Sequence, residues 1–411
     1  MRQLRYKESI RSGIFAFMPP RIFSVLALSF VCGAPALAQE NRLSISGNVN
    51  TGYDSNILRT NERAISEGPQ PVYIVEPTLG IDYSRQFGRQ RIFLDGTAGY
   101  SFHDRYKFLD RETVNLNSGA NIRFGGRCQI DPTARLLIAQ SDLENLGQPV
   151  KNTVTVQDYA VSAYCPSPVG LFPRVSGFLT KTDNSLVRRD RNQTVYGGEF
   201  AIVYRRPSLG DLEANYTVTK VDRFNRIDLT GFPVNDNTTV TNIGIGLTRS
   251  VATRLSGTVR VGYTHANPAS NAVSEFSGMT WSASATYEPT PRIGVTLSGI
   301  RGISASGNTG SSYYVNTGAN VSARYKVSAR TNVSGHVGYS KRDYRGEDRY
   351  LPFGQIGQDK VLSAGAGLGY RLNRRVGLDL RSQYRSRDAD NEFYNYSTWS
   401  ATLGVSVLLR R

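Results

Sequence analysis

The sequence predicts an all-β protein, a transmembrane antiparallel up-and-down β-barrel of about eighteen strands. Two patterns support this prediction. Short segments of alternating apolar and polar residues recur from Leu43 to the end of the chain, and successive side chains of a strand point to opposite faces. The turns between segments are alternately short and long, as in barrels with short periplasmic turns and longer external loops. An even strand count puts both termini on one side, and sixteen strands remain the alternative if one hairpin is misassigned.

The first 38 residues have the features of a secretory signal peptide. Basic residues precede an apolar run at 22–31, and Ala36-Leu37-Ala38 forms a small-x-small cleavage site. Met18 would begin a leader of more ordinary length, so Met1 and Met18 both remain candidate starts. Residues 39–411 are then expected to form one outer-membrane barrel domain.

The strands can be placed along the chain. We expect them at residues 43–54, 73–86, 90–103, 112–124, 129–140, 153–164, 172–183, 193–205, 211–221, 239–249, 254–265, 277–287, 292–303, 312–327, 331–342, 359–372, 375–387 and 395–409. The short connections are rich in Gly, Pro, Ser and Asn, as tight turns are. A soluble β-sandwich is the alternative, in which the apolar faces would pack against one another as a shared core.

Charge and hydropathy narrow the class of protein. Removing residues 1–38 takes five of the 49 bases and one of the 33 acids, which leaves 44 against 32 and a net charge of +12. A basic balance often indicates nucleic-acid binding, but a secreted chain does not routinely meet nucleic acid. We therefore assign the charge to lumen and loops that face acidic headgroups or anionic solutes. The mean hydropathy of −0.35 argues against a helical membrane protein, whereas a barrel with a polar lumen is compatible with it.

Aromatic residues recur near both ends of the predicted strands, on the apolar faces. The external ends carry Tyr53, Tyr100, Phe178, Tyr216, Tyr263, Tyr339 and Tyr384, and the periplasmic ends carry Tyr83, Phe124, Tyr164, Tyr204, Tyr287, Tyr325 and Tyr370. Such rings predict two girdles at the membrane interfaces. For any single tyrosine, ordinary strand propensity is the alternative explanation.

Two cysteines follow the predicted cleavage site. Cys128 begins one expected strand and Cys165 ends the next, so antiparallel pairing brings them together on the periplasmic side. A disulfide is a candidate in an oxidising compartment, and two free thiols are the alternative.

The sequence offers little for catalysis or metal binding. His103, His265 and His336 lie near the ends of different strands without metal-ligand spacing, and no nucleophile with a paired histidine and acid is indicated. The glycine-rich stretch at 365–369 lies inside a predicted strand with no helix after it, which does not fit dinucleotide binding. We expect no catalytic residues, no metal, no cofactor and no enzymatic activity.

Charged residues on the polar strand faces predict a water-filled lumen. The candidate wall residues are Arg123, Arg260, Arg324, Lys326, Arg381, Arg385, Arg387, Asp95, Glu199, Glu213 and Asp379. Guanidinium groups bind carboxylate and phosphate, and mixed rings of charge set pore selectivity. The alternative is that these charges pair with one another and only hydrate the wall.

The stretch Gly52-Tyr53-Asp54-Ser55-Asn56-Ile57 resembles the opening of an outer-membrane β-barrel porin family whose members often accompany exopolysaccharide or capsule loci. The resemblance implies a bacterial outer-membrane barrel that passes polar solutes or takes part in exopolysaccharide export, and it implies no catalytic residues. A non-conducting barrel with an adhesive or structural surface role is the alternative. The expected partners are outer-membrane lipid, the barrel-assembly machinery and polysaccharide export components, and not nucleic acid.

Overall fold

The computed structural model describes residues 41–61, 63, 68–141, 143–144, 151–226, 232–251, 254–271, 273–305, 311–346, 354 and 356–410. The predicted signal peptide at 1–38 lies outside the described residues. Its cleavage site and the choice between Met1 and Met18 therefore remain predictions.

Strands make up nearly all of the described chain. They are β1 (Arg42–Asp54), β2 (Val72–Phe87), β3 (Gln90–His103), β4 (Arg111–Phe124), β5 (Cys128–Gln140), β6 (Thr153–Tyr164), β7 (Gly170–Asn184), β8 (Gln193–Arg206), β9 (Gly210–Asp222), β10 (Thr238–Val251), β11 (Leu255–Pro268), β12 (Phe276–Thr290), β13 (Ile293–Ala305), β14 (Tyr313–Lys326), β15 (Thr331–Arg345), β16 (Gln358–Arg371), β17 (Val376–Ala389) and β18 (Tyr396–Arg410). Three short 3-10 helices lie in the connections: η1 (Lys107–Leu109), η2 (Leu186–Arg191) and η3 (Glu392–Tyr394).

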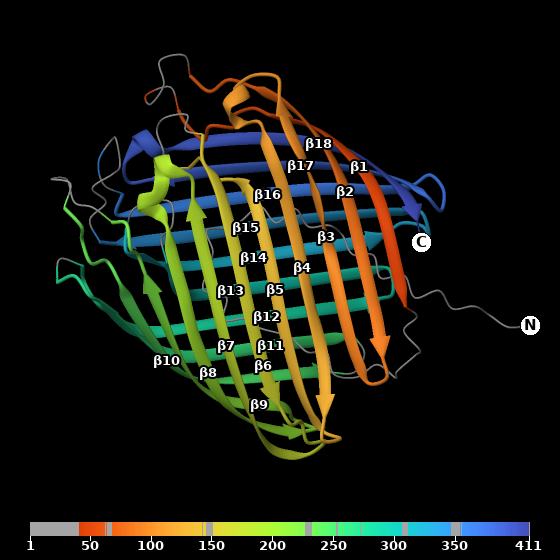
Figure 1. Ribbon diagram of the computed structural model, residues 1–411, viewed down its shortest axis with the longest axis vertical. Helices are drawn as coiled ribbons and strands as arrows, with labels where there is room; N and C mark the ends of the chain where they lie inside the picture. Colours follow the sequence, from red (N-terminus) through yellow and green to blue (C-terminus); the bar gives the residue numbers. More distant parts are fainter. Residues whose placement is uncertain are drawn as a thin grey trace, which may run out of the picture.

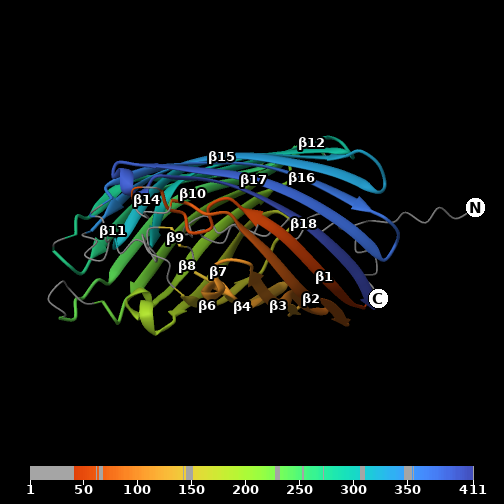
Figure 2. The ribbon, with the colours of Figure 1, turned by 90° about the horizontal axis from the view of Figure 1, so that it is seen from above.

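The described strands form one closed antiparallel barrel (Figures 1 and 2). Each strand pairs with its neighbours in the chain, and β1 also pairs with β18 from Ile45–Arg410 to Asp54–Ser400. Closure leaves no sheet edge, so backbone N–H and C=O groups are satisfied within the membrane, where water is absent. The predicted eighteen-stranded barrel is confirmed, and sixteen strands is not the count.

The strand ends lie close to their predicted positions. The largest differences are three residues, as in β12, which ends at Thr290 and not at 287. The tight turn between β4 and β5 depends on Gly125 and Gly126, whose φ angles of +53° and +79° favour residues without a Cβ atom. The strands are 12 to 16 residues long, more than the 9–11 residues or so that a tilted strand needs to cross the hydrocarbon layer. Their ends therefore project beyond it.

Large apolar side chains cover the outside of the barrel. Leu171 is 68% exposed, and Ile243 and Ile245 are each 63% exposed. The apolar faces point away from one another, which excludes the soluble sandwich with a shared apolar core. Among the described helices, none is long and apolar enough to span a membrane.

The clusters of buried apolar residues lie instead at the end of the barrel that carries the long loops. One cluster joins Tyr314 and Tyr344 of the wall to Tyr394 of η3. Another is made entirely by connections and consists of Leu58, Leu109 and Leu143. The described parts of these connections therefore have small cores of their own at this end of the barrel.

Candidate functional site

The inner face of the barrel is polar. In β9, Glu213, Asn215 and Thr217 are buried towards the lumen, whereas Leu212 and Tyr216 are exposed on the outside. Directly paired residues of neighbouring strands share a face, so the register extends this division around the barrel. The lumen is the candidate functional site.

The register places all the predicted wall residues on the inner face. They are Asp95, Arg123, Glu199, Glu213, Arg260, Arg324, Lys326, Asp379, Arg381, Arg385 and Arg387. Arg260, for example, lies between Gly246 and Ser282 of the adjacent strands. Contact of these side chains with a permeating solute stays a prediction.

Two ion pairs in the periplasmic half of the lumen are exposed. Arg324 lies 3.4 Å from Glu288, and both side chains are about half exposed. Arg381 pairs with Asp379 two residues earlier on the same strand. Exposed pairs of this kind contribute little to stability, roughly 0–1 kcal/mol, and their charges remain available to solutes.

A tighter cluster lies deeper in the wall of β7 to β11. The Arg174 guanidinium is 2.9 Å from the Glu199 carboxylate and 2.8 Å from that of Glu213, and Arg260 lies 3.6 Å from Glu213. Both carboxylates are largely buried. At this cluster the charges pair with one another, as in the alternative to a solute-binding wall that the sequence left open.

Three arginines converge at the external end of the lumen, on β15 and β17. Arg342 Nε and Nη2 each lie 2.6 Å from a carboxylate oxygen of Asp359, on β16. Arg387 Nε donates to Asp359 at 2.7 Å, and Arg385 Nε donates to the Tyr396 hydroxyl at 2.8 Å. We call Arg342, Arg385 and Arg387 the arginine cluster.

A carboxylate from the far side of the barrel completes this cluster. Glu144 follows the end of β5 by four residues, and β5 is eight steps from β15 in one direction around the barrel and ten in the other. Glu144 Oε1 lies 2.8 Å from Arg342 Nη2, and Oε2 lies 2.8 Å from Arg385 Nη2. Glu144 therefore contacts the wall opposite to the strand from which its connection leaves.

The electrostatic environment keeps Glu144 ionised. Burial by itself raises the pKa of this carboxyl group, since its side chain is only 3% exposed. The charges of Arg342, Arg385 and Arg387 act in the opposite direction and outweigh burial, so that the pKa lies well below its usual range. The bridge between the two walls is therefore ionic at neutral pH.

Neighbouring connections fix the position of Glu144. Leu143 packs against Leu58 of the β1–β2 connection and Leu109 of η1. Arg59 of the β1–β2 connection is anchored in turn on Asp54, at 2.9 Å. Packing on one side of Leu143 and ion pairs on Glu144 hold the start of the β5–β6 connection inside the mouth.

Sequence reasoning missed four members of these clusters. Arg174, Arg342 and Asp359 lie on polar faces of predicted strands, so extending the alternation count to every strand would have found them. Glu144 lies in a connection, where no periodicity tells an inward residue from an exposed one. Only the three-dimensional structure brings it to the arginine cluster.

The aromatic girdle needs two corrections. Tyr53, Tyr83, Tyr100, Phe124, Tyr204, Tyr216, Tyr263, Tyr287, Tyr325, Tyr339, Tyr370 and Tyr384 lie on the outer face, and none of them is buried. Tyr164 instead faces the lumen, where its hydroxyl donates to Asp131 at 3.0 Å. Phe178 is also on the inner face, paired with Ala160. The predictions for Tyr164 and Phe178 were wrong because both faces of their strands carry apolar residues. An aromatic ring near the end of such a strand does not identify the face that points outward.

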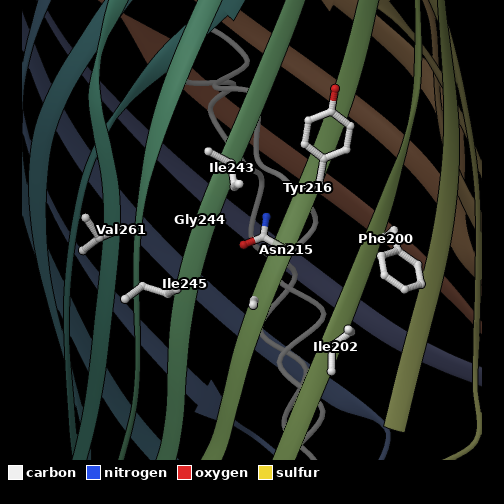
Figure 3. A pocket seen from close by; sticks show the side chains of 9 residues that line it. Phe200, Ile202, Asn215, Tyr216, Ile243, Gly244, Ile245 and Val261 are labelled. Carbon is white, nitrogen blue, oxygen red and sulfur yellow. The ribbon is translucent and has the colours of Figure 1, made fainter.

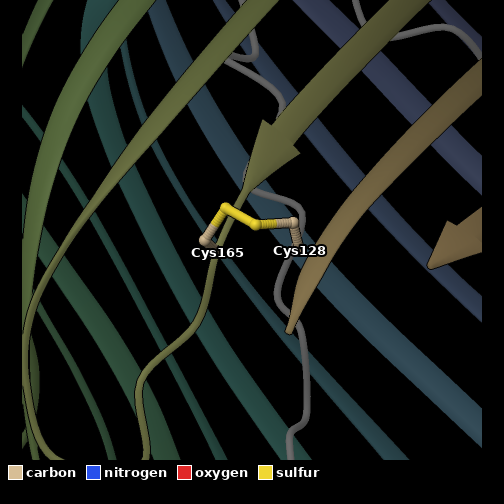
Figure 4. Close-up of a disulfide and its surroundings, with 2 residues drawn as sticks. All are labelled: Cys128 and Cys165. Atoms are coloured by element: carbon tan, nitrogen blue, oxygen red, sulfur yellow. A yellow bond between two sulfur atoms is a disulfide. The ribbon is translucent and has the colours of Figure 1, made fainter. Parts of the chain in front are cut away.

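Cys128 and Cys165 form a disulfide at the periplasmic ends of β5 and β6 (Figure 4). The adjacent residues, Gln129 and Tyr164, are paired in the sheet. The bond therefore fastens the end of the hairpin opposite to the connection that carries Glu144.

An apolar groove on the outside of the barrel does not belong to the lumen (Figure 3). Its volume is about 450 Å³. Ala214 lies between Ile202 and Ile245 in the register, and the groove forms there because the alanine side chain is small. Because these side chains lie on the lipid-facing side, the groove is not a solute site. Within the described ranges, no group of three or more His, Cys, Asp or Glu side chains could hold a metal ion.

A closed barrel with an apolar outer face and a charged lumen defines an integral membrane β-barrel. The family model described as "Putative beta-barrel porin 2" matches residues 179–409, more than half of the chain. The chain belongs to this family and is an outer-membrane β-barrel channel of the porin type.

The chain is also similar to solved structures of very different sequence. OccK2 (OpdF) of Pseudomonas aeruginosa has 9% identity and a TM-score of 0.47, with 89% of this chain and 98% of that chain covered. OccK9 (OpdG) of the same organism has 8% identity and a TM-score of 0.48, with the same coverage. OccAB3 of Acinetobacter baumannii has 11% identity and a TM-score of 0.45, covering 89% and 99%. No curated protein matches the sequence.

Proposed function

We propose that the channel passes small polar solutes, favours anions over cations, and is narrowest where Glu144 meets the arginine cluster. The observation that carries this proposal is the ionic bridge from the β5–β6 connection to Arg342 and Arg385 on the far wall. A segment that crosses the lumen reduces its free cross-section. Among the described side chains of this cluster, three guanidinium groups face two carboxylates, those of Glu144 and Asp359, so positive charge is in excess.

Charge at a constriction governs selectivity because a permeating ion passes within a few ångströms of it. The pairs in the periplasmic half, such as Arg324–Glu288, contain equal numbers of positive and negative groups. Anion preference is therefore assigned to the external end. Outer-membrane lipid on the apolar face and the barrel-assembly machinery are the partners that this proposal requires, and it includes no enzymatic step.

Single-channel recording in a planar bilayer tests the proposal. We expect small, stable conductance steps and a reversal potential on the anion side in a potassium chloride gradient. Replacing Arg342 by Gln should shift the reversal potential towards cations, whereas Arg324→Gln should shift it less. A cation-selective wild type, or equal shifts in the two variants, would contradict the proposed selectivity.

A non-conducting surface barrel is the second candidate, because the external connections pack against one another over the mouth through Leu58, Leu109 and Leu143. Absence of conductance in folded protein would favour it. The same packing stands in the path of a wide polymer, so exopolysaccharide export remains an expectation from the family resemblance alone.

A further inference from the structure

The carboxylate of Glu144 is held as a bound ligand would be. Oε1 lies 2.8 Å from Arg342 and 3.4 Å from Arg387, and Oε2 lies 2.8 Å from Arg385. Both oxygens of one carboxylate are therefore used by three side chains of the opposite wall. We propose that the arginine cluster is a binding site for short carboxylate solutes, which Glu144 occupies as an internal competitor. This inference rests on the proposed function in that the lumen must admit anions.

The site does not depend on Glu144 for its shape. Arg342 and Arg387 are also held by Asp359, which accepts a hydrogen bond from the Tyr344 hydroxyl at 3.0 Å. Arg385 is also held by Tyr396. These partners all lie on β15 to β18, so the guanidinium groups stay oriented when the β5–β6 connection supplies no carboxylate.

The chemistry of the occupant defines the ligand class. Guanidinium groups bind carboxylates through short charge-assisted hydrogen bonds, and the interaction is stronger where water is excluded. Among the described side chains Asp359 supplies the other carboxylate of the cluster, so a solute carboxylate would take the position that Glu144 leaves. Arg387 and Asp359 have no exposed side-chain surface and Arg342 has 3%, so the ligand must present a carboxylate on a narrow stem, as the glutamate side chain does.

Competition lowers the apparent affinity for a free carboxylate. A tethered group competes at an effective concentration on the order of millimolar or higher, and the apparent dissociation constant of the free solute equals its intrinsic value divided by the unoccupied fraction of the site. Removing the tethered charge should therefore strengthen binding of the free solute.

Propionate, which reproduces the end of the glutamate side chain, is the probe. We would measure the propionate concentration that halves the single-channel chloride current of wild type and of Glu144→Gln. The expected result is a decrease of about tenfold or more in this concentration in Glu144→Gln. Propionamide, the uncharged analogue, should act equally and weakly on both proteins. An unchanged value for propionate would overturn the inference.

Glu76→Gln is the matched control. Glu76 is also a lumen-facing carboxylate and accepts a hydrogen bond from Thr113 at 3.1 Å, away from the arginine cluster. This variant removes one negative charge without vacating the site, so propionate should act on it as on wild type. An equal gain in Glu76→Gln would assign the effect to overall charge and overturn the inference. Glu144→Asp is a second variant in case Glu144→Gln does not fold. Its shorter side chain should give a smaller gain of the same sign, and no gain would count against the site.

A measurement that does not need conduction separates this inference from the proposed function. Carbon-13 labelled propionate should show line broadening with detergent-solubilised Glu144→Gln, and the additional change Arg385→Gln should remove it. Broadening in a barrel that does not conduct would support the site and refute the channel selectivity. Anion-selective conduction without broadening or propionate block would support the channel and refute the site.

Discussion

Removal of the disulfide between Cys128 and Cys165 should destabilise the barrel by an amount that the structure allows us to work out. The two cysteines are 37 residues apart in the chain. In the chain-entropy relation, a loop of this length restricts the unfolded chain by about 4 kcal/mol at 25 °C. The β5–β6 ladder runs without interruption from Gln129–Tyr164 to Gln140–Thr153, so the double variant Cys128→Ser/Cys165→Ser should leave the folded state unchanged. The double variant is then expected to lower the free energy of unfolding by at most about 4 kcal/mol.

Urea unfolding of the barrel in lipid vesicles provides the assay. Both tryptophans of the sequence, Trp281 and Trp399, lie on the outer face, so their fluorescence changes when the strands leave the membrane. Mass spectrometry of unreduced protein first establishes the bond, and chemically reduced wild type should unfold like the double variant. A loss of less than about 1 kcal/mol in bonded protein would refute the reasoning, since it would mean that the unfolded chain already retains the hairpin.

Three further outcomes follow from the charges and faces described above. The conductance difference between wild type and Glu144→Gln should persist from pH 7 to about pH 5. The pKa of Glu144 lies well below the ordinary value of about 4.3, so its ionic contacts are lost only as the pH falls through that lowered pKa. A conductance difference that titrates near pH 6 would contradict this prediction. Arg174→Gln should lower the free energy of unfolding in urea by roughly 3 kcal/mol, since it removes the nearest cation from two buried carboxylates, whereas Arg324→Gln in an exposed pair should cost under about 1 kcal/mol. Ile245→Arg should cost about 2–4 kcal/mol in the same assay because the charge would enter lipid, and the substitution Thr248→Arg, on the inner face, should cost less.

The sequence carried enough information for the barrel and for its faces. Alternation over a strand such as β9 separates Glu213 and Thr217 from Leu212 and Tyr216, and one closed sheet is the only way to give every such strand two neighbours in a membrane. Tyr164 and Phe178 show the limit of this signal. Their strands carry apolar residues on both faces near the ends, so the aromatic ring alone does not fix the outward side.

The external constriction could not be predicted in the same way. Glu144 lies in a connection, and its contact with Arg342 joins residues 198 positions apart. No local period encodes a contact between opposite walls of a barrel, because it depends on the strand count, the register and the packing of Leu143 on other connections. Arg385 and Arg387 could be predicted from the sequence as charges on the lumen wall, but their common partner Glu144 could not.

The seam between β1 and β18 has a consequence for how the protein is made. Its side-chain contacts, such as that from the Thr398 hydroxyl to the Asp54 carboxylate at 2.8 Å, join positions 344 residues apart. Contacts of such long range form slowly, because the ordering of the intervening chain precedes the gain. Until β18 is in place, β1 and β17 each present an unpaired row of N–H and C=O groups that can pair with another chain. The newly exported polypeptide therefore has to be shielded from its own copies until its last strand arrives, and a protein cut short before β18 would be more prone to aggregate than one shortened in an external connection.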